Sequence, residues 1–289
     1  MRALACPDRA AARQHLANAL ANNPPSDQDL DALVALYDVY DELGGVPDDH
    51  LRAQNLALAL RNAVRDSYNL TQKNRRLSFI RTLLLQGIER CPVCGIAAPR
   101  ELDHFLPRSV FKCLAIYVRN LVPYCHDCNQ LKSAHVADDD NHRFVHPYFD
   151  DIPDIQFVQV SLDLDGAALR AEYSIVGMEG LPEPLRERLA YQFERLKLNE
   201  RFCRELVNYM SGHTAALHII FNASAAPGVS DFLAHQAEVE RTRLHRNDWR
   251  AVLLRALSAH GAFCAGGFRD VFPLPPRGGG PLLAVAEAA

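Results

Sequence analysis

The chain has 289 residues, of which 48% are hydrophobic and 23% are charged, and its formal net charge is -4 at pH 7. This length suffices for two or three compact units, and the composition is that of a globular protein rather than a disordered or fibrous one. No apolar run approaches the roughly 18 residues of a membrane span. The first residues lack the apolar segment of a secretory signal, so we expect a cytoplasmic protein with no membrane association.

Residues 1–88 are predicted to form an N-terminal helical domain. Four helices are expected, over residues 8–22, from Ser26 to Gly44, and over residues 47–66 and 75–87. Ser26 is followed three residues later by Asp29, which is a weaker version of a capping box and marks a helix start. Two roles remain open for this domain: a folding scaffold for the segment that follows, or a surface that positions DNA or docks a partner.

Two Cys-x-x-Cys pairs, Cys91/Cys94 and Cys125/Cys128, follow these helices. Zn²⁺ takes four thiolates in a tetrahedron with no open position, which is typical of a structural rather than a catalytic site. Because no export signal is expected, metal binding accounts for the pairs better than disulfides do. The remaining cysteines are expected to be small core residues or inert thiols: Cys6, Cys113, Cys203 and Cys264.

The segment between the two pairs is longer than in a usual zinc ribbon, so something folded is expected there. Residues 100–104 and 121–124 are predicted strands, and a helix is expected to start near Asn129. On the first strand Asp103 and His104 are adjacent, so their side chains point to opposite faces. One of them can then bind a metal while the other faces a nucleophilic water. Residues 89–152 are therefore predicted to form a separate domain.

Basic residues gather in and just before this segment. Residues 71–120 contain nine lysines and arginines against three acidic residues. A local basic patch can bind phosphate even in a chain that is acidic as a whole. The alternative is a solvated helix face.

Residues 153–270 are predicted to form a C-terminal domain of a hairpin and several helices. Apolar and polar residues alternate over 158–164 and again over 169–175, with Asp165-Gly166 as the turn between them. The helical period returns at Pro182, and further helices are expected over residues 201–221, 230–245 and 248–260. Residues 271–289 are rich in proline and glycine and are predicted to be a flexible tail.

Asp103-His104, Asn120 and the run from Cys125 to Lys132 resemble the HNH endonuclease motif in its zinc-braced, four-cysteine form. The resemblance covers the segment from Cys91 to Ser133. It implies a ββα-metal core, which carries the four-cysteine zinc site. Together with the helices and hairpin expected from the residues, the fold class is mainly α with a small α+β unit, in which this core is flanked by helical regions and a β-hairpin. The stretches LDHFLPRS, NLVPYCHDCN and FVHPYFD are also similar to a branch of bacterial HNH proteins, some of which are linked to phage defence.

The resemblance implies a role for each matching residue. His104 corresponds to the general base that activates water, and Asp103 and Asn129 correspond to ligands of a catalytic Mg²⁺ or Mn²⁺. Asn120 corresponds to the central asparagine, which shapes the loop and orients the base. Ser133 stands where some relatives have a second helical metal ligand, so water is expected to complete the coordination. Candidate contacts to nucleic acid are Arg108, Lys112 and Lys132.

We therefore expect a metal-dependent endonuclease that hydrolyses phosphodiester bonds in DNA, in a setting of phage defence or restriction. A hard cation with oxygen ligands can neutralise charge that develops on the phosphate, and an unprotonated imidazole can take a proton from water. A regulatory ATPase or another sensor protein is the expected partner, because an unregulated nuclease is toxic. Two alternatives remain: a non-catalytic zinc module that binds nucleic acid or a protein, and an RNA-cleaving nuclease.

Overall fold

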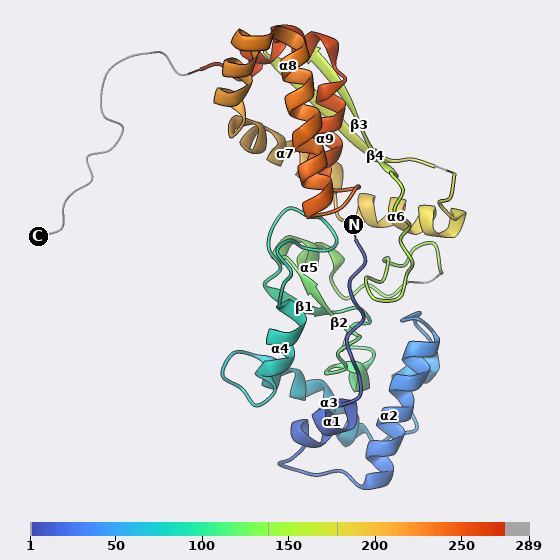
Figure 1. The fold of residues 1–289 in the computed structure, drawn as a ribbon. Coiled ribbons are helices and arrows are strands. Elements are labelled where there is room, and N and C mark those ends of the chain that lie inside the picture. Colours follow the sequence, from blue (N-terminus) through green and yellow to red (C-terminus); the bar gives the residue numbers. More distant parts are fainter. Residues whose placement is uncertain (1, 138, 178, 275–289) are drawn as a thin grey trace, which may run out of the picture.

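The chain is mainly α-helical, with two small antiparallel sheets of two strands each. The computed structural model describes residues 2–274 apart from residues 138 and 178, so the predicted tail lies outside the described residues from residue 275 onward. Figure 1 shows three tiers, in which the sheet of β1 and β2 with helix α5 lies between the N-terminal helices and the C-terminal hairpin with its helices. The fold class is therefore confirmed at the level of a mainly α chain with a small α+β unit.

The N-terminal tier contains the four predicted helices, although two of them are shorter than expected and one is interrupted. They are α1 (Ala12–Ala19), α2 (Asp27–Glu42), α3 (Leu58–Ser67) and α4 (Ser78–Leu85), with 3-10 turns at Asp49–Arg52 and Tyr68–Thr71. Ser26 caps α2 by accepting a hydrogen bond from the backbone N–H of Asp29, as predicted. The predicted continuous helix over residues 47–66 was wrong, because Ala53 takes a left-handed conformation, with φ 52°, and ends the first turn.

The middle tier is a strand, a long loop, a second strand and a helix. Strand β1 (Glu101–His104) pairs with β2 (Leu121–Tyr124), so that Glu101 faces Tyr124 and His104 faces Leu121. Pro123 is tolerated in β2 because each strand of a two-stranded sheet has a free edge. Helix α5 (His126–Lys132) follows directly. This order of elements agrees with the one expected from the residues.

The long loop between β1 and β2 is held by helix α2. The rings of Tyr37 and Tyr117 stack with centroids 4.0 Å apart. The Tyr117 hydroxyl donates to Asp41 at 2.7 Å, and Arg119 donates to the same carboxylate at 2.6 Å. A buried aromatic stack with charge-assisted hydrogen bonds fixes the loop on the N-terminal tier.

The C-terminal tier consists of a hairpin covered by helices. Its elements are β3 (Val158–Asp165), β4 (Ala168–Ile175), α6 (Glu183–Arg195), α7 (Leu198–Ser211), α8 (Thr214–Arg243), α9 (Trp249–Ser258), a π-helical turn (Phe263–Gly267) and α10 (Phe268–Val271). The hairpin is confirmed, but its turn is one residue later than predicted, because Asp165 pairs with Ala168. The helix boundaries expected at residues 201–221 and 230–245 were wrong. A break at Gly212 separates α7 from α8, and a kink at Ala225 (φ 50°) replaces the expected gap inside α8.

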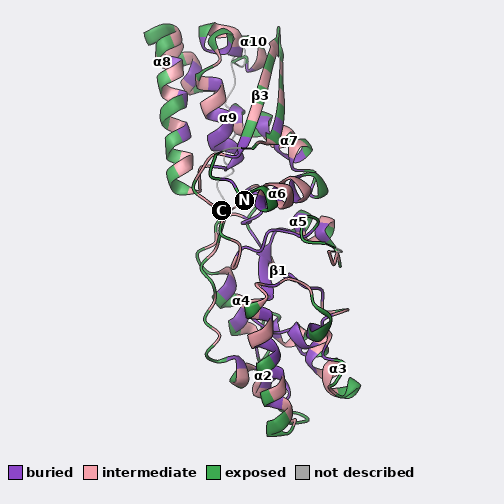
Figure 2. Ribbon diagram, turned by 90° about the vertical axis from the view of Figure 1, so that its right-hand side faces the viewer, coloured by how far each residue is buried: buried purple, intermediate pink, exposed green. Residues whose placement is uncertain are grey.

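Burial follows these tiers. In Figure 2 strand β1 is buried, whereas α8 exposes one face along much of its length.

Among the described residues, no single helix is long and apolar enough to cross a membrane. Within the described part of the chain, one pair of helices, Trp249–Ser258 and Phe263–Val271, reaches that length and composition together, but the pair is bent by 83°.

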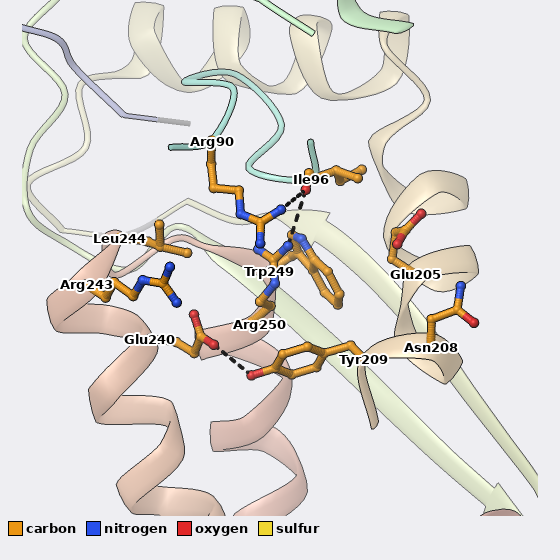
Figure 3. Close-up of a pocket in the computed structure, with 10 residues that line it drawn as sticks. All are labelled: Arg90, Ile96, Glu205, Asn208, Tyr209, Glu240, Arg243, Leu244, Trp249 and Arg250. Atoms are coloured by element: carbon orange, nitrogen blue, oxygen red, sulfur yellow. Dashed lines mark hydrogen bonds between the residues drawn. The ribbon is translucent and has the colours of Figure 1, made fainter. Parts of the chain in front are cut away.

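The loop that carries the first cysteine pair contacts the C-terminal tier. Arg90 donates to the Ile96 carbonyl at 2.8 Å, and Arg250 donates to the Gly95 carbonyl at 3.0 Å. Figure 3 shows Arg90 and Arg250 both directed at Ile96, above a pocket of about 410 Å³ that Trp249 and Tyr209 also line. The second tier is thus bonded to the third through backbone carbonyls of the cysteine loop.

Candidate functional site

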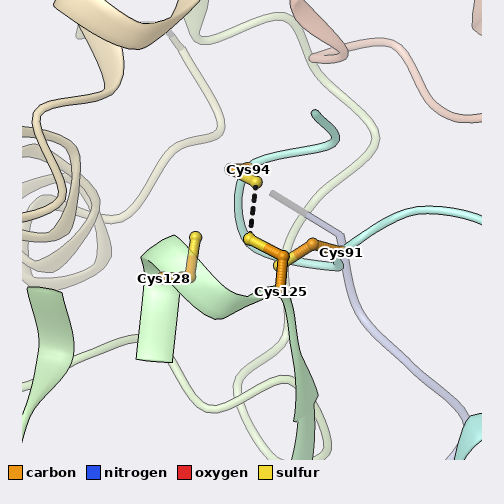
Figure 4. Close-up of side chains that lie close together, drawn as sticks. All are labelled: Cys91, Cys94, Cys125 and Cys128. Atoms are coloured by element: carbon orange, nitrogen blue, oxygen red, sulfur yellow. Dashed lines mark hydrogen bonds between the residues drawn. The ribbon is translucent and has the colours of Figure 1, made fainter. Parts of the chain in front are cut away.

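The four predicted zinc ligands lie together. The sulfur atoms of Cys91, Cys94, Cys125 and Cys128 are all within 4.8 Å of one another, and all four residues are buried. The first pair comes from the loop before β1, and the second pair comes from the start of α5 (Figure 4). Four converging thiols are the donor set that structural Zn²⁺ takes, so these residues fit a zinc ion.

The backbone around the first pair supports metal binding. Gly95 has φ +68°, and its N–H donates to the Cys91 carbonyl at 2.8 Å, which closes a tight turn. The N–H of Ile96 donates to the Cys94 sulfur at 3.4 Å. Such a bond stabilises a thiolate, because it places a backbone dipole on the charged sulfur.

A buried arginine from the C-terminal tier completes the cluster. The Arg201 guanidinium on α7 donates to the sulfurs of Cys128 at 3.3 Å, Cys94 at 3.7 Å and Cys125 at 3.8 Å. Burial alone would lower the pKa of Arg201, but the thiolates outweigh it and raise the pKa above its ordinary value. Four thiolates around one Zn²⁺ carry a net charge of about -2, which Arg201 partly neutralises.

Replacing Arg201 with methionine is therefore expected to destabilise the protein by about 3–5 kcal/mol, because an uncompensated charge would remain buried. Chemical denaturation followed by circular dichroism measures this change. Arg204 is exposed on the same helix, so Arg204→Met should leave the free energy of unfolding close to that of the wild type. Equal stability of the two variants would contradict a role for Arg201 in charge compensation.

The two faces of β1 carry different chemistry. The burial along the strand alternates, so that Leu102 and His104 are buried while Glu101 and Asp103 are partly exposed. Glu101 and Asp103 lie on one face because side chains two residues apart point the same way. Asp103 and His104 thus lie on opposite faces, as the sequence predicts.

His104 is buried, and one hydrogen bond orients its ring. Its exposed fraction is 5%, its ring lies 4.5 Å from the ring of Tyr68, and its Nε2 is 2.9 Å from the carbonyl oxygen of Ala115. Since a carbonyl only accepts, Nε2 carries the proton and Nδ1 keeps its lone pair. No hydrogen bond to Nδ1 is found within residues 2–274 as the structure describes them. Burial lowers the pKa of His104 to about 3, so the ring is neutral at pH 7.

His146 is a second buried histidine, and the two make the fold sensitive to acid. Burial lowers the pKa of His146 to about 3 as well. An unfolded histidine takes up a proton below about pH 6.5, whereas these two folded side chains do not until about pH 3. The unfolded state therefore binds more protons between these values, and folding becomes less favourable as the pH falls through this window.

We expect each of these histidines to reduce the free energy of unfolding by about 2 kcal/mol between pH 6.5 and pH 5, because one pKa unit corresponds to about 1.4 kcal/mol. Denaturant titrations at several pH values, with zinc content measured in each sample, test this. In His146→Gln, the free energy of unfolding should fall by about 2 kcal/mol less over this pH range than in the wild type. His50 is exposed, so His50→Gln should show the same pH dependence of the free energy of unfolding as the wild type. A pH dependence in His146→Gln equal to that of the wild type would contradict the assignment.

The face of β1 under α5 contains a network of polar groups. Lys132, which is 1% exposed, donates to Asp103 Oδ2 at 2.9 Å and to the His104 carbonyl at 2.7 Å. Asn129 donates through its amide to Glu101, and His126 Nδ1 lies 2.9 Å from the same carboxylate. Burial raises the pKa of Asp103, and Lys132 opposes that shift. Helix α5 is thereby hydrogen-bonded to both polar side chains on this face of β1, Glu101 and Asp103.

Asn120 is buried at the end of the long loop, and its side chain makes four hydrogen bonds to described residues. Its Oδ1 accepts from the N–H of Leu106 at 2.8 Å and from the Tyr40 hydroxyl at 3.1 Å. Its Nδ2 donates to the carbonyls of Leu106 at 3.1 Å and Leu114 at 3.2 Å. The Tyr40 hydroxyl is also 3.0 Å from His146 Nε2. Asn120 therefore ties together both ends of the loop that passes over His104.

The three candidate nucleic-acid contacts differ in exposure. The guanidinium of Arg108 lies 4.7 Å over the ring of Tyr68, and Lys112 donates to Asn62 at 2.8 Å. Both are partly exposed, whereas Lys132 is buried against Asp103. Arg108 and Lys112 are therefore accessible to a ligand, and Lys132 is enclosed.

Comparisons with known proteins add one partial likeness. A segment of 85 residues, 28% of this chain, is 38% identical to protein ea31 of Escherichia phage lambda and spans 29% of that protein. No protein-family model matches the chain, and no solved structure matches it. The site is therefore interpreted from its own geometry.

The structure brings together the four cysteines, and it joins Asp103 to Lys132. It does not show a direct contact between Asp103 and Asn129 among the described residues, because Asn129 bonds to Glu101. Glu101 was missed in the sequence, although its position two residues before Asp103 on a predicted strand was a sufficient signal. Arg201 was also missed, and no spacing in the sequence relates it to the cysteines.

Proposed function

We propose that the protein is a metal-dependent endonuclease of the HNH type, in which His104 is the general base that activates water against a phosphodiester bond. The observation that carries this proposal is the state of His104. Its ring is neutral and buried, its Nε2–H is held by the Ala115 carbonyl, and its Nδ1 has no partner among the described residues. A neutral imidazole with one fixed and one free nitrogen is suited to accept a proton from water.

A bound phosphodiester would make His104 a stronger base. The nearby side chains Arg108 and Lys132 contribute to its low pKa, after burial. An anion beside the ring has the opposite effect and favours the protonated form. The histidine is thus kept unprotonated until the anionic substrate arrives, and its basicity rises when the substrate is in place.

The oxygen donors on the other face of β1 fit a hard divalent cation. Asp103 and Glu101 each offer a carboxylate, and the Asn129 side chain supplies an amide oxygen. Mg²⁺ and Mn²⁺ prefer such oxygen ligands and retain water at the remaining positions. When bound, the cation would neutralise charge on the phosphate. Lys132 holds Asp103 in position from the buried side.

The remaining contacts support a positioning role for the neighbouring residues. Tyr68 packs against the His104 ring and donates through its hydroxyl to the Leu102 carbonyl on the same strand. Asn120 fixes the loop that contains Ala115, which in turn fixes the His104 ring. A base whose orientation is set by its surroundings needs no reorganisation during the reaction.

We propose DNA as the substrate, and the basic residues of the segment 71–120 support a nucleic acid because few of them are neutralised. Of the nine lysines and arginines in residues 71–120, only Arg119 makes an ion pair with a described residue. Unpaired cations bind phosphate backbones and release counterions. A role in phage defence or restriction, with a regulatory ATPase or sensor partner, belongs to the same proposal and rests on the family resemblance.

The test incubates the zinc-loaded protein with supercoiled plasmid, linear duplex and total RNA, each with Mg²⁺, with Mn²⁺ and without added divalent ions. Metal-dependent conversion of plasmid to nicked or linear DNA, with 5′-phosphate ends, is the expected result. Cleavage of RNA alone would indicate the RNA-cleaving alternative. A folded, zinc-loaded protein that binds nucleic acid or a protein but cleaves nothing would indicate a non-catalytic zinc module.

A further inference from the structure

A polar pocket of about 380 Å³ lies where the N-terminal helices meet the loop after β1. It is formed by the 3-10 turn Asp49–Arg52, helix α3 and the loop up to Lys112. The side chains that line it are Arg52, Gln54, Arg61, Ser109, Val110 and Lys112. None of these described lining residues is acidic, and three of them are cationic.

Two of the three cations in this pocket, Arg61 and Lys112, form no ion pair with a described residue. Among the described residues, no carboxylate lies within ion-pair distance of Arg61 or Lys112, and Lys112 bonds only to the neutral amide of Asn62, at 2.8 Å. The Nε of Arg61 is buried and has no hydrogen-bond partner. Arg52 pairs with Asp49, whose side chain is 93% exposed, so this pair is weak. A buried donor without an acceptor is costly, and an anionic ligand in this pocket would supply one.

Other arginines of the chain are arranged differently. Arg143 pairs with Asp140 and Asp150, and Arg188 pairs with the same two carboxylates. Arg143 and Arg188 are thus neutralised by the protein's own acids, whereas Arg61 and Lys112 have no ion-pair partner among the described residues. A ligand that neutralised Arg61 and Lys112 would be anionic.

The donors in the pocket match a phosphate group. Two guanidinium groups and one ammonium group offer charged N–H donors, and Gln54 and Ser109 add neutral ones. Guanidinium groups bind phosphate oxygens in a bidentate manner, and an ammonium group acts as a point charge beside them. Val110 is the lining residue that contributes no side-chain donor.

The pocket is linked to the site around His104 through Arg108 and Tyr68. Arg108 precedes Ser109 of the pocket, and its guanidinium lies 4.7 Å over Tyr68. The Tyr68 ring also packs against the His104 ring, with centroids 4.5 Å apart. Residues 104–112 thus connect the proposed base with the cationic pocket through direct contacts.

We propose that Arg52, Arg61 and Lys112 form a phosphate-binding pocket that holds the backbone of a DNA strand beside the site of cleavage. This inference rests on the proposed nuclease function for the identity of the polymer, and it assigns the N-terminal helical region a role in positioning DNA. The pocket binds the backbone without reading sequence, because phosphate contacts carry no base information.

The test measures binding of a fluorescein-labelled DNA duplex to the full chain by fluorescence anisotropy, without added Mg²⁺ or Mn²⁺. Salt is varied between about 50 and 200 mM, because each phosphate contact contributes about 0.9 to the slope of log K against log salt. The double variant Arg61→Gln/Lys112→Gln should bind about tenfold more weakly, with a slope reduced by about 1.8. Circular dichroism and zinc content verify that each variant is folded.

The matched control removes the same charge elsewhere. Arg170 is 71% exposed on the hairpin and Arg204 is exposed on α7, so Arg170→Gln/Arg204→Gln should retain the affinity and slope of the wild type. Equal affinity and slope in both double variants would overturn the inference, as would a wild-type chain that binds no duplex.

Further arms of the same experiment identify the source of the phosphate. Displacement of the duplex by an unlabelled duplex, but not by equimolar inorganic phosphate, supports a backbone site. Inorganic phosphate could instead bind at the pocket while Arg61→Gln/Lys112→Gln keeps the DNA affinity of the wild type. That result would overturn the backbone site in favour of a site for a free anion. Binding of single-stranded RNA alone would overturn the choice of DNA.

Failure of this inference differs from failure of the proposed function. Plasmid cleavage is measured in the same preparations after Mg²⁺ is added. If the wild type cleaves but the pocket variant binds as tightly as the control, only the pocket assignment fails. If the pocket variant loses binding and the wild type cleaves nothing, the nuclease function fails and the DNA-binding pocket remains.

Discussion

Replacing Cys125 with serine is expected to abolish zinc binding and to unfold the segment from Cys91 to Lys132. The elements of this segment are too small to be stable alone, since each strand has four residues and α5 has seven. A structural zinc site contributes about 10–16 kcal/mol, which is as large as the stability of an average domain, about 5–15 kcal/mol. The zinc content should fall to near zero, and amide protons in β1, β2 and α5 should lose protection in hydrogen exchange.

Cys203→Ser is the matched control for this experiment. Cys203 lies on α7, partly buried, and its thiol contacts the Ala171 carbonyl at 3.0 Å rather than the cluster. The control should retain one zinc per chain and native exchange protection. A Cys125→Ser protein with a full zinc complement and a protected middle tier would contradict the assignment of the four thiols as a zinc site.

His104→Ala is expected to lower the rate of DNA cleavage by a factor of about 10²–10⁴, which is the usual contribution of a general base. The reason is the loss of the ring nitrogen that takes the proton from water. Single-turnover cleavage of a plasmid under saturating Mg²⁺ measures the chemical step. Zinc content and duplex affinity should be close to those of the wild type, because His104 is neither a thiolate nor a cation.

His245→Ala controls for the loss of a largely enclosed imidazole. Burial lowers the pKa of His245 to about 2, and the residue lies beyond the end of α8, outside the site. Its replacement should leave the cleavage rate within a few fold of the wild type. A wild-type rate in a folded His104→Ala protein would remove His104 from the chemistry.

Local sequence signals gave much of the middle tier. The spacing of the two cysteine pairs predicts a cluster because four thiols at such spacing share a metal, and the sulfurs do converge. The period of two along β1 predicts that Asp103 and His104 face opposite ways, and their burial alternates accordingly. Both predictions rest on residues that are close in the sequence, and the spacing of such residues can be read directly from the sequence.

Other features depended on contacts between distant segments and could not be predicted. Arg201 reaches the Cys128 sulfur from 73 residues away. The kink at Ala225 precedes Pro227, yet the helix resumes because tertiary packing of α8 on α9 outweighs the local break. The left-handed residue Ala53 ends the turn before α3 without any glycine to signal it. In each case tertiary packing overrides local preference.

The contact between Arg201 and the zinc ligands links the metal to the arrangement of the C-terminal tier. Thermodynamic reciprocity requires that whatever docking of α7 contributes to zinc affinity, bound zinc contributes equally to the docking of α7. A zinc ion at this cluster would therefore stabilise more than the middle tier, because zinc occupancy and the docking of α7 are coupled. A molecule that pulls α7 away from the cluster would weaken zinc binding, and loss of zinc would release α7.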